Sequence, residues 1–172
     1  MRGTYTLIIA CKKPFRTDVG KLGRVNVGKG YYVYTGSALG QGAVSLEGRL
    51  SRHLRASKRR QWHVDYLTSR RNCTTKIVIS VNSNKQLECS VNQVIMSRLP
   101  VKPLLPHAGS SDCRCEAHLV KVVPRMPQKQ IVHVLMNIYG LLGEPIRLSP
   151  SAVTRSRGLS PIGLGKRRER FG

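Results

Sequence analysis

The sequence predicts an α+β protein with a basic C-terminal extension, and three observations support this. Short apolar, β-branched runs typical of strands occur over residues 4–11, 30–35 and 74–81. Segments with apolar residues at helical spacing lie between and after them. From Pro145 onward Pro, Ser, Gly and Arg dominate, and such a composition cannot build a core. We therefore divide the chain into a main domain at 1–124, a helical segment at 125–144 and a tail at 145–172.

The first part of the chain contains three predicted strands. Residues 4–11 are apolar on both faces, so we expect a strand that lies centrally in a sheet. Residues 24–27 can form a short strand, and residues 30–35 form a β-branched and aromatic one. The intervening residues 12–23 include one proline and two glycines, which predicts a loop.

A helix is predicted over about residues 43–56, after a loop of small residues at 36–42. Leu46, Leu50 and Leu54 recur at a spacing of four, so they form an apolar stripe on one face of this helix.

The second part of the chain mixes both kinds of element. Residues 62–69 fit either a strand or a helix, whereas residues 74–81 predict a strand. Residues 86–99 predict a helix that ends before a proline-rich stretch. A last strand is expected at 117–123, and an amphipathic helix at 128–142.

The charge of the chain indicates a polyanionic partner. Thirty Lys and Arg against eight Asp and Glu give a net charge of +22, and such self-repulsion is most simply relieved by nucleic acid. Basic clusters are often only solvated faces, but at this net charge we expect them to contact phosphates. The residues expected to do so are Arg52, Arg55, Lys58, Arg59, Arg60, Arg70, Arg71, Arg155, Arg157, Lys166, Arg167, Arg168 and Arg170.

Neither a membrane span nor a secretory leader is apparent in the sequence. No apolar run approaches the ~20 residues of a spanning helix, and the apolar run near the N-terminus is too short for a signal peptide core. We therefore expect a cytoplasmic protein that does not associate with membranes.

Five cysteines are present, which is an odd number. Without a secretory signal a disulfide is not expected, so free thiols or a metal site fit better. Cys113, Cys115 and His118 offer three possible zinc ligands, although structural zinc needs four and usually a wider cysteine spacing. Cys89, Cys73 or His107 could complete the set. The alternative is a polar turn that supports a neighbouring site.

Arg49 and His53 lie four residues apart on the predicted helix and therefore point to one side. They border the leucine stripe, at the rim of the packed face. A guanidinium there can hold a phosphate and an imidazole can move a proton. The alternative is that both belong to a solvated basic face with Arg52 and Arg55.

Two short motifs and this helix together resemble the GIY-YIG nuclease family. The motifs are Gly3-Thr4-Tyr5 and Tyr34-Thr35-Gly36, and the Arg49/His53 helix follows them. Members of that family share a small antiparallel sheet flanked by helices and cleave phosphodiester bonds. The resemblance implies that strands 4–11 and 30–35 are adjacent and antiparallel. Two departures are the long spacing between the motifs and the threonines where the family has isoleucines.

The resemblance also implies roles for five side chains. Tyr5, Tyr34, Arg49 and His53 match the family's catalytic positions, and Glu88 matches the residue that binds Mg²⁺ or another divalent cation. Without the resemblance, Glu88 is an ordinary acid in the first turn of a helix, and the tyrosines are strand packing.

The sequence is most similar to a branch of this family that is found largely in archaea, alone or fused to endonuclease III-type repair proteins. The segments that carry this similarity are Gly30–Ala38, Trp62–Leu67 and Ser111–Leu119, and the match covers about residues 3–123.

Two functions follow. One is a divalent-metal-dependent endonuclease that acts on structured DNA. The other is a non-catalytic RNA-binding component of an archaeal ribosome or another ribonucleoprotein, which the Arg-, Gly- and Pro-rich tail favours. The sequence leaves both the choice between DNA and RNA and the oligomeric state open.

Overall fold

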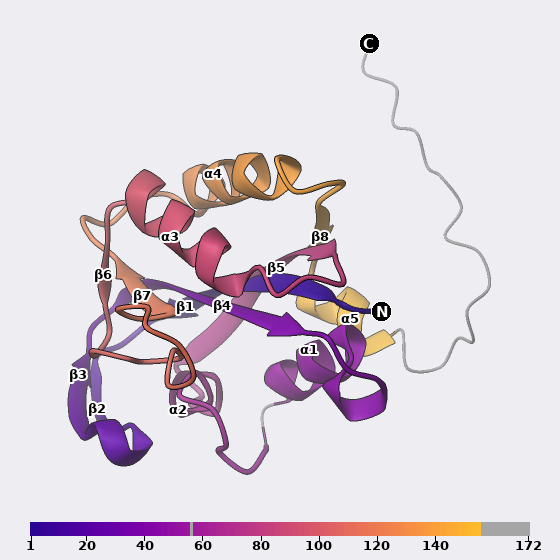
Figure 1. Ribbon diagram of the computed structural model, residues 1–172. Helices are drawn as coiled ribbons and strands as arrows, with labels where there is room; N and C mark the ends of the chain where they lie inside the picture. Colours follow the sequence, from indigo (N-terminus) through magenta and orange to yellow (C-terminus); the bar gives the residue numbers. More distant parts are fainter. Residues whose placement is uncertain (56, 156–172) are drawn as a thin grey trace.

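In the computed structural model, which describes residues 1–55 and 57–155, a six-stranded antiparallel sheet forms the centre of the molecule (Figure 1). Its order is β6-β7-β4-β1-β5-β8. The strands are β1 (Gly3–Cys11), β4 (Gly30–Ala38), β5 (Cys73–Asn82), β6 (Val101–Pro103), β7 (Leu119–Val122) and β8 (Ile146–Leu148). A separate hairpin pairs β2 (Phe15–Asp18) with β3 (Arg24–Val27). The predicted α+β class is confirmed.

The strand β1 lies between β4 and β5, as its two apolar faces predicted. Tyr5, Leu7, Ile8 and Ile9 are fully buried, because helices cover both faces of the sheet at this strand. β1 and β4 pair antiparallel, with Tyr5 opposite Gly36 and Leu7 opposite Tyr34. The side chains of a strand alternate between its faces, so this register places both motif tyrosines on one face of the sheet.

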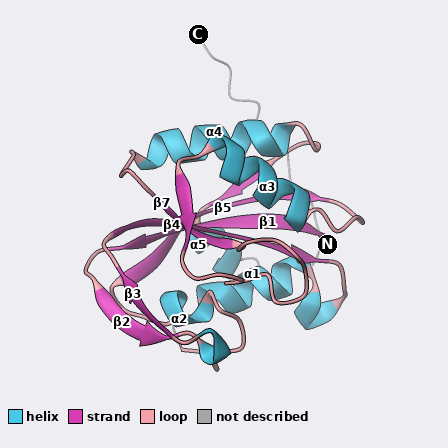
Figure 2. Cartoon of the chain, turned by 60° about the vertical axis from the view of Figure 1, so that its left-hand side comes forward, coloured by secondary structure: helices cyan, strands magenta, loops and turns pink. Residues whose placement is uncertain are grey.

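Helices pack on both faces of this sheet (Figures 1 and 2). α1 (Leu46–Leu54), α2 (Asp65–Thr68) and α5 (Pro150–Arg155) cover one face, and α3 (Glu88–Arg98) and α4 (Gln128–Gly140) cover the other. Two short 3₁₀ helices, η1 (Gly20–Leu22) and η2 (Gly42–Val44), lie in connections. None of the helices in the described part of the chain is long and apolar enough to span a bilayer.

The predicted elements differ from the observed ones mainly at their ends. α1 begins at Leu46 and not at residue 43, because the Ser45 side chain accepts a hydrogen bond from the Gly48 backbone N–H and caps the helix there. The ambiguous segment 62–69 contains the one-turn helix α2. The expected loop at 12–23 is wrong in part, since residues 15–18 form β2, which pairs with β3 in a hairpin.

The start of the predicted tail packs on the sheet. β8 pairs with β5, with Leu148 opposite Val78, and Val153 of α5 is buried. Residues 146–155 therefore pack on the folded unit, although the composition from Pro145 onward predicted only a tail that cannot build a core. β8 is stabilised by pairing with the edge of β5, and the composition of residues 146–148 alone does not predict this contact. Some of the predicted phosphate contacts lie outside the described residues, namely those of Arg157, Lys166, Arg167, Arg168 and Arg170.

The cysteine expectation is also corrected. Cys11 and Cys73 form a disulfide that joins β1 to β5. The register places the two residues opposite each other, with their Cα atoms 4.1 Å apart. An argument from the cellular compartment could not reveal this pairing, because it depends on which strands are neighbours.

Candidate functional site

A cavity of about 350 Å³ opens where β4 continues past the end of β7. β7 pairs with β4 only as far as Tyr34, so the last residues of β4 are left beside α1, the start of α3 and two loops. The cavity is lined by Tyr34, Thr35, Gly36, Ser37, Leu39, Arg49, Gln61, Trp62, His63, Gln86, Glu88, Gly109, Ser111, Asp112 and His118.

The two motif tyrosines meet behind this cavity. Their ring centroids are 6.4 Å apart. A Cβ atom at Gly36 would lie 2.8 Å from the Tyr5 hydroxyl and 3.4 Å from the Tyr34 hydroxyl. The glycine of the second motif is therefore required because the two hydroxyl groups occupy the space that a side chain would need.

Burial raises the pKa of both tyrosines, to about 12 for Tyr34 and well above the usual value for Tyr5. The positive charge of Arg49 opposes this rise in each case, and a polar contact with Tyr5 lowers the pKa of Tyr34 slightly. Both hydroxyl groups therefore carry their protons at neutral pH. Before either tyrosine oxygen could accept a proton from a ligand, its own proton would have to pass to a neighbouring base.

Arg49 brings an incompletely bonded guanidinium to the cavity. Its side chain is half-buried, and its guanidinium carbon lies 5.4 Å from the centroid of the Trp62 ring. Within residues 1–55 and 57–155, no acceptor bonds its buried Nε. A buried donor without a partner is unfavourable, so a phosphate oxygen entering the cavity would satisfy it.

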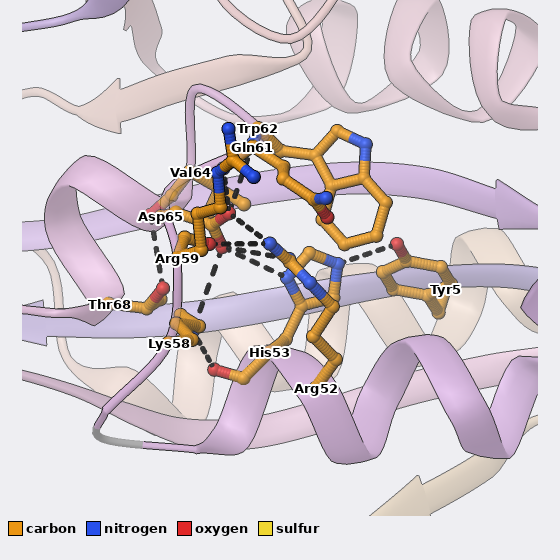
Figure 3. Close-up of polar contacts among 10 residues, drawn as sticks. All are labelled: Tyr5, Arg52, His53, Lys58, Arg59, Gln61, Trp62, Val64, Asp65 and Thr68. Atoms are coloured by element: carbon orange, nitrogen blue, oxygen red, sulfur yellow. Dashed lines mark hydrogen bonds and ion pairs between the residues drawn. The ribbon is translucent and has the colours of Figure 1, made fainter. Parts of the chain in front are cut away.

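His53 does not line the cavity with Arg49, although the helical spacing predicted a shared surface. Its side chain is fully buried, and its Nε2 atom lies 2.8 Å from the Tyr5 hydroxyl oxygen (Figure 3). Burial lowers the pKa of His53, which favours the neutral imidazole. His53 can therefore accept a proton from Tyr5 but cannot touch a ligand in the cavity. Tyr5, fully buried, is also behind the cavity wall.

Asp65 is the residue that the sequence reasoning did not assign. Its fully buried carboxylate lies 3.8 Å from the Nδ1 atom of His53 (Figure 3). It accepts hydrogen bonds from the backbone N–H groups of Gln61 and Trp62, at 2.9 and 3.0 Å, and from Arg52 at 3.0 Å. Burial alone would raise the pKa of Asp65, but the contact with His53, together with these donors, holds it well below its usual range. The only signal in the sequence was its place in the segment Trp62–Leu67.

Two residues that were expected to contact phosphates are instead committed to Asp65. The Nζ atom of Lys58 lies 3.6 Å from the Asp65 carboxylate and donates to the His53 carbonyl, and its side chain is 3% exposed. Burial lowers the pKa of Lys58 to about 8. Arg52 pairs with Asp65 and stacks over Trp62, 4.0 Å from the ring centroid. Arg52 and Lys58 are therefore engaged within the protein, whereas Arg55, Arg59, Arg60 and Arg71 are exposed, and the phosphate contacts of all six stay a prediction.

Glu88 lines the same cavity as Arg49, as was expected. It lies in the first turn of α3, and Ser37 donates a hydrogen bond to its Oε2 atom. Gln86 donates to Oε1 at 2.5 Å. These donors orient a carboxylate that is 8% exposed and faces the cavity, where it could bind a cation.

Beside Glu88, four side chains form a cluster that could hold a metal ion. The thiols of Cys89, Cys113 and Cys115 and an imidazole nitrogen of His118 all lie within 4.8 Å of one another. Of the three candidates for a fourth ligand, Cys89 is the one that completes the set, and Cys73 is in the disulfide. Cys89 follows Glu88 directly, so the cluster ties the start of α3 to the loop before β7.

Comparison with known proteins places the chain in one family. Residues 4–140 match the family described as domain of unknown function DUF123, and the chain belongs to it. No curated protein and no solved structure matches the chain significantly.

Proposed function

We propose that the protein is a divalent-metal-dependent endonuclease of GIY-YIG type, of the branch found alone or fused to endonuclease III-type proteins. The observation that supports this most directly is the convergence of Tyr34, Arg49 and Glu88 on one cavity. These side chains come from β4, α1 and α3, and they occur in the order of the motifs that resemble the family. A purely structural RNA-binding surface would not need a carboxylate opposite an incompletely bonded guanidinium.

Glu88 is the residue that would hold the divalent cation. One carboxylate completed by water ligands suits Mg²⁺, and the donors from Ser37 and Gln86 fix its orientation. When bound, such a cation stabilises negative charge on the phosphate and the leaving oxygen. Arg49 supplies a second positive charge and N–H donors to the non-bridging phosphate oxygens.

A chain of proton carriers extends inward from the cavity. Tyr34 faces the cavity, Tyr5 lies behind it, and the Tyr5 hydroxyl lies 2.8 Å from Nε2 of His53, to which it can donate when Nδ1 carries the imidazole proton. When a water attacks phosphorus, its proton passes to the Tyr34 oxygen, the Tyr34 proton passes to the Tyr5 oxygen, and the Tyr5 proton moves to Nε2 of His53. The new P–O bond forms as the ester P–O bond breaks, and the leaving oxygen takes a proton from solvent. Asp65 stabilises the imidazolium that results, since its charge lies 3.8 Å from Nδ1.

Cleavage assays test the proposal. Full-length protein is incubated with linear and branched DNA and with RNA, in Mg²⁺ or in EDTA. We expect cleavage that depends on Mg²⁺ and that Glu88→Gln abolishes. The affinity for the nucleic acid should stay nearly unchanged, because the variant loses the cation but keeps the basic residues. Glu144→Gln, which removes an exposed carboxylate, is the matched control. Cleavage that survives Glu88→Gln would exclude this carboxylate from the reaction.

The net charge of +22 supports a second candidate, a non-catalytic RNA-binding component of an archaeal ribosome or another ribonucleoprotein. That function predicts binding without a need for Mg²⁺ at Glu88 and no cleavage of any substrate. It also predicts co-purification with ribosomes through a high-salt wash. Loss of the protein from ribosomes in that wash, together with cleavage of DNA, would favour the endonuclease.

We further propose that the Cys3His cluster binds zinc. Tetrahedral zinc with bonds of ~2.3 Å to sulfur and ~2.0 Å to nitrogen places its ligand atoms ~3.5–3.8 Å apart. The Cys113 Sγ and His118 Nε2 atoms are 3.7 Å apart. Four protein ligands leave no open position, so this zinc would be structural and would fix the start of α3, where Glu88 lies. Mass spectrometry of metal content should find zinc in stoichiometric amount, and its absence would refute the assignment.

A further inference from the structure

A second concavity, of about 620 Å³, lies on the other side of the loop that borders the first cavity. Residues 61–63 of this loop line the first cavity, and residues 57, 58 and 60 line the second. The end of α1, the end of α2, the first residues of β5 and the start of α5 form its remaining walls. We call this concavity the basic groove.

The lining of the basic groove is basic and rich in hydroxyl groups. Its cations are Lys58, Arg60, Arg70 and Arg71, and of these Lys58 is already paired with Asp65. Its hydroxyl groups are those of Ser57, Thr68, Ser69, Thr74 and Thr75. None of the described residues that line it carries a carboxylate. Its volume is within the ~300–1,000 Å³ of common ligand pockets, but this lining suits an anion and not an apolar ligand.

Two donors in the wall of the basic groove have no partner. The Nε of Arg70 and the hydroxyl oxygen of Ser69 are buried, and no hydrogen bond reaches either from the described residues. Such groups destabilise the folded state when they stay unsatisfied. A phosphate offers several strong acceptors, which suit such donors.

Two of the arginines are held in place before any ligand arrives. Arg70 donates to the Thr17 hydroxyl at 3.3 Å and lies over Phe15, 5.4 Å from the ring centroid. Arg60 lies over Tyr66, at 5.3 Å. Stacking on a ring face leaves the N–H groups in the guanidinium plane available, and it reduces the side-chain entropy that binding would otherwise remove.

We propose that the basic groove is a second phosphate site, which holds backbone phosphates of the nucleic acid beyond the one that enters the cavity. The shared loop makes the two concavities neighbours, so one strand can pass across residues 57–63 and occupy both. This extends the proposed function by naming a substrate that continues past the cleavage point. The competing source of the same chemistry is a free phosphate group, either inorganic or on a small molecule.

Arginine Nε–H resonances test the site directly. ¹⁵N-labelled full-length protein carrying Glu88→Gln, which prevents cleavage, is titrated with single strands of increasing length and separately with inorganic phosphate. We expect the Arg70 signal to shift only with strands long enough to cross the loop, whereas the Arg49 signal shifts with short strands as well. A shift with inorganic phosphate that long strands do not produce would assign the groove to small anions and overturn the proposal.

A matched pair of variants gives a second readout. The double variant Arg60→Gln/Arg71→Gln removes two groove cations, and Arg98→Gln/Lys102→Gln removes two exposed cations outside the groove. Each lost phosphate contact reduces the slope of log affinity against log salt by ~0.7 on a single strand. We expect a reduction of ~1.4 for the groove variant and little change for the control. Equal slopes would refute the groove. Groove binding without any cleavage would instead refute only the endonuclease.

Discussion

Asp65→Asn should destabilise the protein strongly, because it removes a buried negative charge without changing the size of the side chain. The carboxylate is fully buried between Arg52, Lys58 and His53, and the Lys58 side chain is itself 3% exposed. Breaking a buried pair by removing one partner costs about 3–5 kcal/mol, since the other charge stays buried without compensation. Typical domains are stable by only ~5–15 kcal/mol, so the loss would be a large part of the total.

The effect should also depend on pH in a defined direction. The folded-state pKa of Asp65 is well below the ~3.9 of an unfolded aspartate. Its contribution to stability is therefore complete above about pH 4 and is lost as the pH falls further. The difference in unfolding free energy between the wild type and Asp65→Asn should shrink below pH 4. Urea unfolding followed by the fluorescence of Trp62, the single tryptophan, measures this at pH 7 and at pH 3.

Two further variants make the test decisive. Asp18→Asn removes an exposed carboxylate that pairs with Arg24, and it should cost less than about 1 kcal/mol. Adding Lys58→Met to Asp65→Asn removes the uncompensated ammonium and should restore part of the loss. If Asp65→Asn costs no more than Asp18→Asn, the reasoning about the buried network is refuted.

Three other changes probe the site. Gly36→Ala should destabilise the protein by about 1–3 kcal/mol, because the added methyl group would contact the Tyr5 hydroxyl. Thermal melts should show that adding Tyr5→Phe restores part of this loss. Equal melting temperatures for Gly36→Ala and the wild type would contradict the close approach. Tyr5→Phe alone should slow cleavage by about 100-fold or more in single-turnover assays, because the proton path to His53 is cut; an unchanged rate would remove Tyr5 from the mechanism. Cys113→Ser should lower the zinc content by mass spectrometry and the melting temperature together, and retention of full zinc would show that the metal is bound elsewhere.

Local residue patterns are enough to predict most of the helices and strands and part of the site. β1 was predictable because both of its faces are apolar, and α1 and α4 because their apolar residues follow the helical period. Local patterns of this kind depend only on neighbouring residues. The resemblance predicted one surface for Tyr5, Tyr34, Arg49, His53 and Glu88. Of these, Tyr34, Arg49 and Glu88 line the cavity, and Tyr5 and His53 lie behind it.

The remaining strand pairing, the disulfide and the buried network depend on contacts that form only in the folded chain. The pairing of β8 with β5, the Cys11–Cys73 disulfide and the completion of the cysteine cluster by Cys89 all join residues that are distant in the sequence. Asp65 could not be assigned from its neighbours, since its role depends on Arg52, Lys58 and His53 meeting it in a buried space. In the same network Asp65 pairs with Arg52 and Lys58, two cations that the sequence pattern places on the surface. Burial and long-range contact determine the protonation and the partners of an ionisable group, and neither is encoded in local residue patterns.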